Sequence, residues 1–197
     1  MPLRNLLSSP VLLLVMLAVP VRAHLMVAQH GTLNFVDNAV FMVISIPVSA
    51  FAGIDDNQDG KVTMFEFNRN RDAVLSAVRS NVSLTDEEGV LVLEGILLSP
   101  VTAHDRYPET LSDLTVMGRF NLRKSASALR FESRLYGDEE SAQTLKMLAT
   151  RRSNGYQTEF VLTPDNPARF LFVDIPQGSS PSLARKLQVS MSSEEFN

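Results

Sequence analysis

The chain has 197 residues, of which 45% are hydrophobic, and its formal net charge is −4 at pH 7. This length suffices for one domain with a hydrophobic core, and the weakly acidic balance excludes the basic surface that a nucleic-acid partner requires. The sequence contains no cysteine, which excludes disulfides and a lipid-modified cysteine.

Residues 1–23 have the pattern of a secretory signal peptide. Arg4 supplies a positive start, residues 11–19 form an apolar segment, and Pro20 ends it before a small residue at the cleavage site, Ala23. A membrane anchor is the alternative, but this apolar segment is too short to cross a bilayer, which takes about 20 residues. We therefore expect an exported protein with no membrane span after cleavage. The lack of cysteine favours a bacterial periplasm or the cell exterior.

The next segment has the pattern of a β-hairpin. Apolar residues alternate through Leu33 and Phe35, a turn follows at Asp37, and a second apolar run extends to Pro47. Because residues 42–46 are apolar at nearly every position, we expect a central strand that is covered on both faces.

Residues 55–66 carry oxygen-bearing groups at a spacing suited to Ca²⁺, which takes six to eight oxygen ligands. Gly60 occupies the sixth place, where a sharp turn with positive φ favours a residue without Cβ. A surface turn without an ion also uses Asp, Asn and Gly, but it requires neither Thr at the ninth place nor Glu at the twelfth. The donors are the side chains at positions 1, 3, 5, 9 and 12 and the backbone carbonyl at position 7, namely Asp55, Asn57, Asp59, Thr63, Glu66 and Lys61.

This segment resembles the calcium-binding loop of the EF-hand family, and the resemblance includes Val62 at position 8, where paired EF-hands join through a short β-bridge. No second loop has this spacing, and Pro47 and Gly53 interrupt the segment where an entering helix would stand. We therefore expect the ion to order the segment around it and not to operate a switch. The resemblance implies that Ca²⁺ is bound by Asp55, Asn57, Asp59, Lys61, Thr63 and Glu66.

After the loop, an apolar stripe through Phe67, Val74 and Val78 predicts a helix over residues 66–81. From Val82 onward the apolar period changes to two, which is typical of strands. The strands are predicted at 82–84, 90–98, 114–122, 128–136, 157–162 and 169–173, with a short helix within 138–150.

Short strands separated by turns predict a mainly β fold of the α+β class, an antiparallel β-sandwich that carries one EF-hand-type loop and helix. We expect three parts: the signal peptide at 1–23, a β-rich domain at 24–175 with the loop and helix inserted at 51–81, and a polar C-terminal tail at 176–197.

The sequence carries no HExxH, GxSxG, P-loop or dinucleotide-binding motif, so we expect no enzymatic activity. The expected function is that of an exported calcium-binding protein whose single site mainly stabilises a β-rich binding or structural domain. One alternative is a calcium-dependent module that recognises a protein partner.

A second alternative involves copper. Cleavage after Ala23 makes His24 the N-terminal residue, and its amine and imidazole, together with His30 or His104, resemble the histidine brace of periplasmic copper-binding sandwiches. The Ala23–His24 start, the strand-rich opening and the acidic loop are also similar to extracytoplasmic parts of bacterial hydrogenase and urease accessory membrane proteins of the HupE/UreJ type. That similarity is partial, and we transfer no transport function from it.

Overall fold

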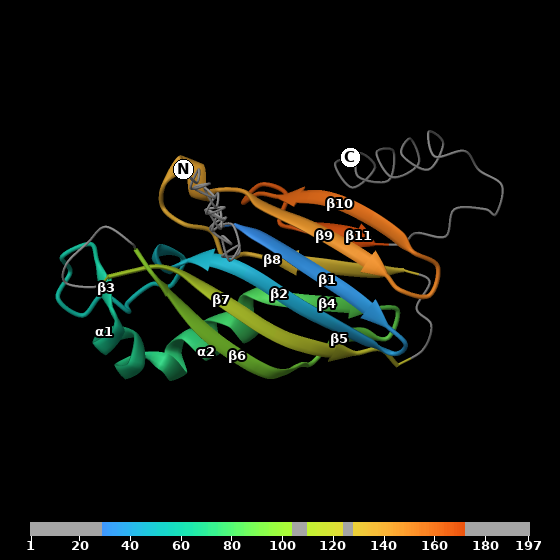
Figure 1. The fold of residues 1–197 in the computed structure, drawn as a ribbon, viewed down its shortest axis with the longest axis horizontal. Coiled ribbons are helices and arrows are strands. Elements are labelled where there is room, and N and C mark those ends of the chain that lie inside the picture. Colours follow the sequence, from blue (N-terminus) through green and yellow to red (C-terminus); the bar gives the residue numbers. More distant parts are fainter. Residues whose placement is uncertain (1–28, 104–109, 124–127, 172–197) are drawn as a thin grey trace, which may run out of the picture.

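Two β-sheets lie face to face in a computed structural model that describes residues 29–103, 110–123 and 128–171 (Figure 1). The predicted mainly β, sandwich-like fold of the α+β class is confirmed. The predicted signal peptide at 1–23 and the predicted tail at 176–197 lie outside the described residues. No helix in the described part of the chain is long and apolar enough to cross a membrane.

The larger sheet has seven strands in the order β10-β9-β1-β2-β7-β3, with β6 also paired to β7. Its neighbours are antiparallel except for β1 and β9, which run parallel. The predicted hairpin near the start is confirmed as β1 and β2, joined at Asp37, whose φ is 51°. The strands are β1 (His30–Val36), β2 (Ala39–Pro47), β3 (Val62–Thr63), β6 (Leu93–Thr102), β7 (Thr110–Asn121), β9 (Leu145–Arg151) and β10 (Tyr156–Leu162).

The smaller sheet has four strands in the order β11-β8-β4-β5, all antiparallel. One segment predicted as a single strand, 90–98, instead divides at Val92 between the two sheets, because β5 pairs with β4 whereas β6 pairs with β7. The strands are β4 (Val82–Asp86), β5 (Gly89–Leu91), β8 (Leu129–Ser133) and β11 (Ala168–Leu171).

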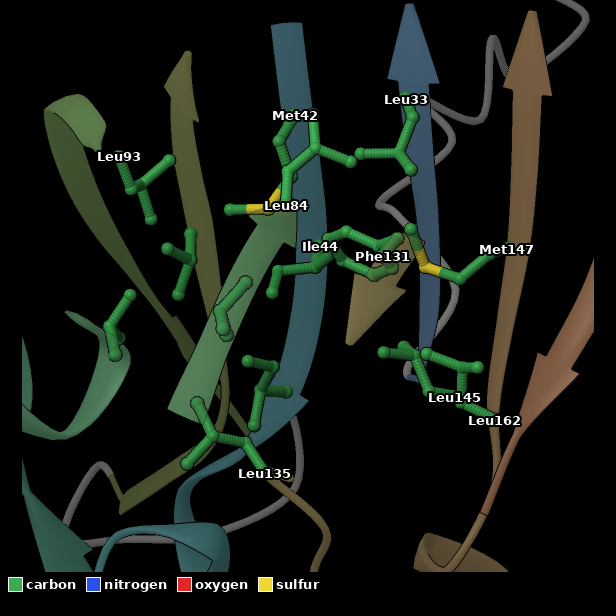
Figure 2. Close-up of a cluster of buried hydrophobic side chains, with 14 of the residues drawn as sticks. Leu33, Met42, Ile44, Leu84, Leu93, Phe131, Leu135, Leu145, Met147 and Leu162 are labelled. Atoms are coloured by element: carbon green, nitrogen blue, oxygen red, sulfur yellow. The ribbon is translucent and has the colours of Figure 1, made fainter. Parts of the chain in front are cut away.

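The core lies between the sheets and is built from alternate residues of their strands. Figure 2 shows Met42, Ile44 and Met147 of the larger sheet together with Leu84 and Phe131 of the smaller one. The rings of Phe131 and Phe160 meet edge to face across the two sheets, with their centroids 6.5 Å apart. Such aromatic pairs stabilise a core beyond the area that they bury.

The burial of β2 agrees with the prediction for residues 42–46, where only Val43 is partly exposed, and the outer face opens at Phe41, which is 45% exposed. The prediction of a short helix within 138–150 was wrong. The segment 138–150 holds only a 3-10 turn, η2 (Glu140–Ala142), before β9 begins. The alternating burial of Leu145 and Met147 is a strand pattern, and pairing with both β1 and β10 outweighs local helix propensity there.

We expect Phe131→Ala to lower the free energy of unfolding by about 3–5 kcal/mol, since it removes a fully buried ring that contacts the opposite sheet. Phe41→Ala is the matched control on an exposed position and should cost less than about 1 kcal/mol. Urea unfolding of both variants measures the difference, and equal losses would contradict the assignment of the core.

Candidate metal centre

The loop lies in the insertion between β2 and β3, two strands that pair with the same edge of β7. Strand β2 ends where Pro47 pairs with Asp113, and β3 then takes up the edge where Val62 pairs with Leu111. The chain between them forms a 3-10 turn, η1 (Val48–Ala50), and the predicted calcium loop. Figure 1 shows β3 and the adjoining α1 at one end of the long axis of the molecule. Both ends of this insertion are therefore fixed to the larger sheet.

The segment that enters the loop is almost without helix, as the sequence predicted. Only the three residues of η1 are helical, and Gly53 has a positive φ of 76°. Phe51 and Ile54 are buried in the core at 4% and 2% exposure. Apolar packing therefore holds the start of the loop in the place where an EF-hand normally has a helix.

The first half of the loop is curled by hydrogen bonds from backbone N–H groups to its own side chains. One carboxylate oxygen of Asp55 accepts from the N–H of Gly60 at 2.8 Å, and the other accepts from the N–H of Asp59 at 3.3 Å. Asn57 Oδ1 accepts from the N–H of Asp59 at 3.0 Å, and Asp59 Oδ1 accepts from the N–H of Lys61 at 2.9 Å. The side chains at positions 1, 3 and 5 are thus turned toward the interior of the loop.

Positive φ angles at two residues allow this curl. Gln58 has a φ of 60° and Gly60 a φ of 75°. A Cβ at Gly60 would meet no atom within 4 Å, so the need for glycine there comes from the backbone angle and not from crowding. This agrees with the positive φ that the sequence predicted at position 6.

The carboxylate of Glu66, at position 12, closes the loop. It is 5% exposed and accepts three hydrogen bonds, from the N–H of Asp56 at 3.1 Å, from the N–H of Thr63 at 2.9 Å and from Thr63 Oγ1 at 2.7 Å. The Thr63 hydroxyl also accepts from the N–H of Glu66, which completes a capping box at the start of α1. The hydrogen bond from the Thr63 N–H, with the others, lowers the pKa of Glu66 and keeps it ionised.

Glu66 has no cationic side chain as a partner within the described residues. The nearest arginine on the same helix, Arg69, pairs with Asp56 instead at 3.7 Å. Burial of the carboxylate alone would raise its pKa, but the hydrogen bonds outweigh that effect, so Glu66 carries a negative charge that no described cationic side chain balances. The position therefore suits a cation that the chain itself does not supply.

The candidate ligand side chains do not converge on one point in this structure. Over residues 29–103, 110–123 and 128–171, no three His, Cys, Asp or Glu side chains gather closely enough to hold a metal. The carboxylates of Asp55, Asp59 and Glu66 are instead engaged with backbone N–H groups of the same loop. The donor set fits a hard cation in type and order, but the side chains must move toward a common point to coordinate one.

The helix after the loop is interrupted, which corrects the predicted single helix over 66–81. It consists of α1 (Met64–Arg69) and α2 (Arg71–Asn81), separated at Asn70. The side-chain amide of Asn70 donates to the carbonyl of Ile54 at 3.4 Å, to Asp56 Oδ1 at 3.1 Å and to the carbonyl of Glu66 at 3.0 Å. Asn70 thereby connects the start of the loop to the helix that follows it. The sequence analysis did not identify this residue, since an Asn within a helical stripe gives no sign of such distant partners.

The predicted apolar stripe holds the two helices against the core. Phe67 of α1 and Val74 and Val78 of α2 are buried, as the spacing predicted. The guanidinium of Arg71 lies 5.9 Å from the centre of the Phe67 ring, within range of a cation–π contact. The insertion is thus packed onto the sandwich through its exiting helices.

The histidines of the copper alternative are only partly described. His30 is the first residue of β1, opposite Lys146 of β9. His24 and His104 lie outside the described residues, so the copper alternative stays a prediction.

A cleft of about 650 Å³ lies beside the loop. Asp55, Gly60 and Lys61 form part of its wall, and the segment around η2 contributes another part. One side of the donor loop therefore borders an open cleft.

Comparison of the chain with protein-family models gave no match, and a search of curated proteins gave no relative.

We expect Asn70→Ala to lower the free energy of unfolding by about 1–3 kcal/mol, because it removes the amide group whose two hydrogens are shared among Ile54, Asp56 and Glu66. Asn68→Ala on the exposed side of α1 is the matched control and should change stability by less than about 0.5 kcal/mol. Thermal unfolding compares the two variants. If Asn70→Ala were as stable as the wild type, the hydrogen bonds between loop and helix would contribute nothing to stability.

Proposed function

We propose that residues 55–66 bind one Ca²⁺ and that the protein is an exported calcium-binding protein whose ion stabilises a β-rich binding or structural domain. The observation that carries the proposal is the environment of Glu66. This carboxylate is buried and ionised, and no cationic side chain among the described residues pairs with it, at the place where a calcium loop of this length needs its closing ligand.

Each ligand has a defined role in the proposed site. Asp55, Asn57 and Asp59 give side-chain oxygens from the curled first half, and Lys61 gives its backbone carbonyl. Thr63 binds directly or through a water, and both carboxylate oxygens of Glu66 coordinate the ion. The proposed ligands are therefore Asp55, Asn57, Asp59, Lys61, Thr63 and Glu66.

The donor chemistry favours calcium among common metals. All the donors are oxygens, and hard cations prefer oxygen to nitrogen or sulfur. The loop combines side chains of unequal length with a carbonyl, and Ca²⁺ tolerates such irregular coordination better than Mg²⁺, which requires a near-ideal octahedron.

The affinity should be modest. The side chains must give up hydrogen bonds to backbone N–H groups before they converge, and Asn57 is a neutral ligand at a position where a carboxylate would attract the ion more strongly. Extracellular calcium modules work with dissociation constants of about 10⁻⁴–10⁻³ M, which suits the exported location that the first 23 residues predict.

Calcium would stabilise more than the loop. Thr63 belongs to β3, which pairs with β7 in the larger sheet, and Glu66 lies in the first turn of α1. An ion held by both residues joins the sheet edge to the exiting helix. An ion concentration tenfold above the dissociation constant adds about 1.4 kcal/mol to stability.

Calorimetric titration with Ca²⁺ and thermal unfolding test the proposal. The wild-type protein should bind one ion and unfold at a higher temperature when calcium is present. Glu66→Gln should weaken binding by about tenfold or more, because it removes a charge and one of the two oxygens that close the shell.

Glu159→Gln is the matched control, since Glu159 is an exposed residue of β10, a strand that does not contribute to the loop. This variant should bind calcium as the wild type does. Absence of binding heat and of stabilisation in the wild-type protein would refute the proposal, as would equal binding by Glu66→Gln.

A further inference from the structure

Two large apolar side chains are exposed inside the proposed calcium loop. Met64 is 40% exposed and Phe65 is 73% exposed, and they occupy positions 10 and 11 between the candidate ligands Thr63 and Glu66. They begin α1 at one end of the long axis of the molecule (Figure 1). We call this pair the Met64/Phe65 tip.

We propose that the Met64/Phe65 tip inserts into the surface of an anionic phospholipid bilayer when the loop holds calcium. The inference rests on the proposed calcium site and assigns that site a partner. It follows from the exposed apolar pair, from the charges around it and from the place of the pair within the loop.

The charge of the insertion changes sign when one Ca²⁺ binds. Residues 48–81 contain five acidic and four basic side chains, a net charge of −1. One divalent ion brings this value to +1 and the charge of the whole chain from −4 to −2, so calcium removes the local repulsion between the insertion and an anionic surface. The acidic residues are Asp55, Asp56, Asp59, Glu66 and Asp72, and the basic ones are Lys61, Arg69, Arg71 and Arg79.

Two basic residues are close to the apolar pair in the sequence. Arg69 follows Phe65 by four residues on α1, which places both on the same side of the helix; its side chain is 68% exposed and also pairs with Asp56 at 3.7 Å. Lys61 is exposed in the loop just before β3. A cation beside an aromatic side chain suits the headgroup region of a bilayer, where an apolar group enters and a charge stays with the phosphates.

The size of the patch favours a lipid surface over a protein partner. A stable protein interface buries about 1,200–2,000 Å² in total, far more than two side chains supply. A bilayer needs no complementary groove, and each apolar side chain that enters it contributes separately.

The position of the pair explains why calcium would control the contact. Thr63 and Glu66 flank the tip, and an ion held by both fixes the backbone that carries Met64 and Phe65. Without the ion, the loop keeps the negative charges of Asp55, Asp59 and Glu66 close in sequence to the tip, and these charges repel an anionic surface.

Co-sedimentation with vesicles tests the inference. The full chain is mixed with vesicles of phosphatidylcholine alone or with added phosphatidylglycerol, in calcium or in a chelator, while calorimetry records calcium binding in parallel. Binding should require both calcium and phosphatidylglycerol. Phe65→Ala should lower vesicle binding by about tenfold or more without changing calcium binding, since a factor of ten corresponds to about 1.4 kcal/mol and burial of a Phe contributes at least that much.

Phe41→Ala, the same change at an exposed position of β2, is the matched control and should bind vesicles as the wild type does. Calcium binding without vesicle binding would overturn the membrane inference and leave the calcium site intact, whereas loss of both would refute the two together. Vesicle binding that persists in chelator, or in Phe65→Ala, would also overturn it. So would calcium-dependent self-association of the chain in place of vesicle binding.

Discussion

The carboxylate of Glu66 connects three parts of the insertion. It accepts hydrogen bonds from Asp56 at the start of the loop and from Thr63 at its end, and it lies in the first turn of α1. Because the group is buried and ionised, its solvation has to be replaced by these N–H and O–H donors and, in our proposal, by an ion. The curl of the loop, the start of the helix and the proposed chemistry all depend on where this one side chain lies.

In our proposal, the sandwich performs two tasks that the entering helix and the second loop perform in a paired EF-hand. The short strand beside position 8 pairs with β7 through Val62 and Leu111, in the place of a partner loop. Packing of Phe51 and Ile54 into the core replaces an entering helix. A single loop attached to a rigid sheet at both ends has little freedom to open, so calcium here would alter stability and surface charge more than overall shape.

Local patterns in the sequence were enough to predict the sandwich, the first hairpin, the lack of an entering helix and the buried stripe of the exiting helix. They failed where contacts between residues distant in the sequence determine the local structure. Leu145 and Met147 form a strand because β1 and β10 flank them, and Asn70, at the break between α1 and α2, bonds to the carbonyl of Ile54, sixteen residues earlier. The ligand spacing is visible in the sequence, but the burial of Glu66 without a cationic partner and the pairing of β3 with β7 appear only in three dimensions.

Amide hydrogen exchange measured by NMR with and without calcium tests most directly whether an ion joins the loop to the sheet. The account predicts slower exchange with calcium where β3 pairs with β7, at Val62 and Leu111, while the distant hairpin of β9 and β10 stays unchanged. Exchange rates that are the same in both conditions throughout the loop would contradict it.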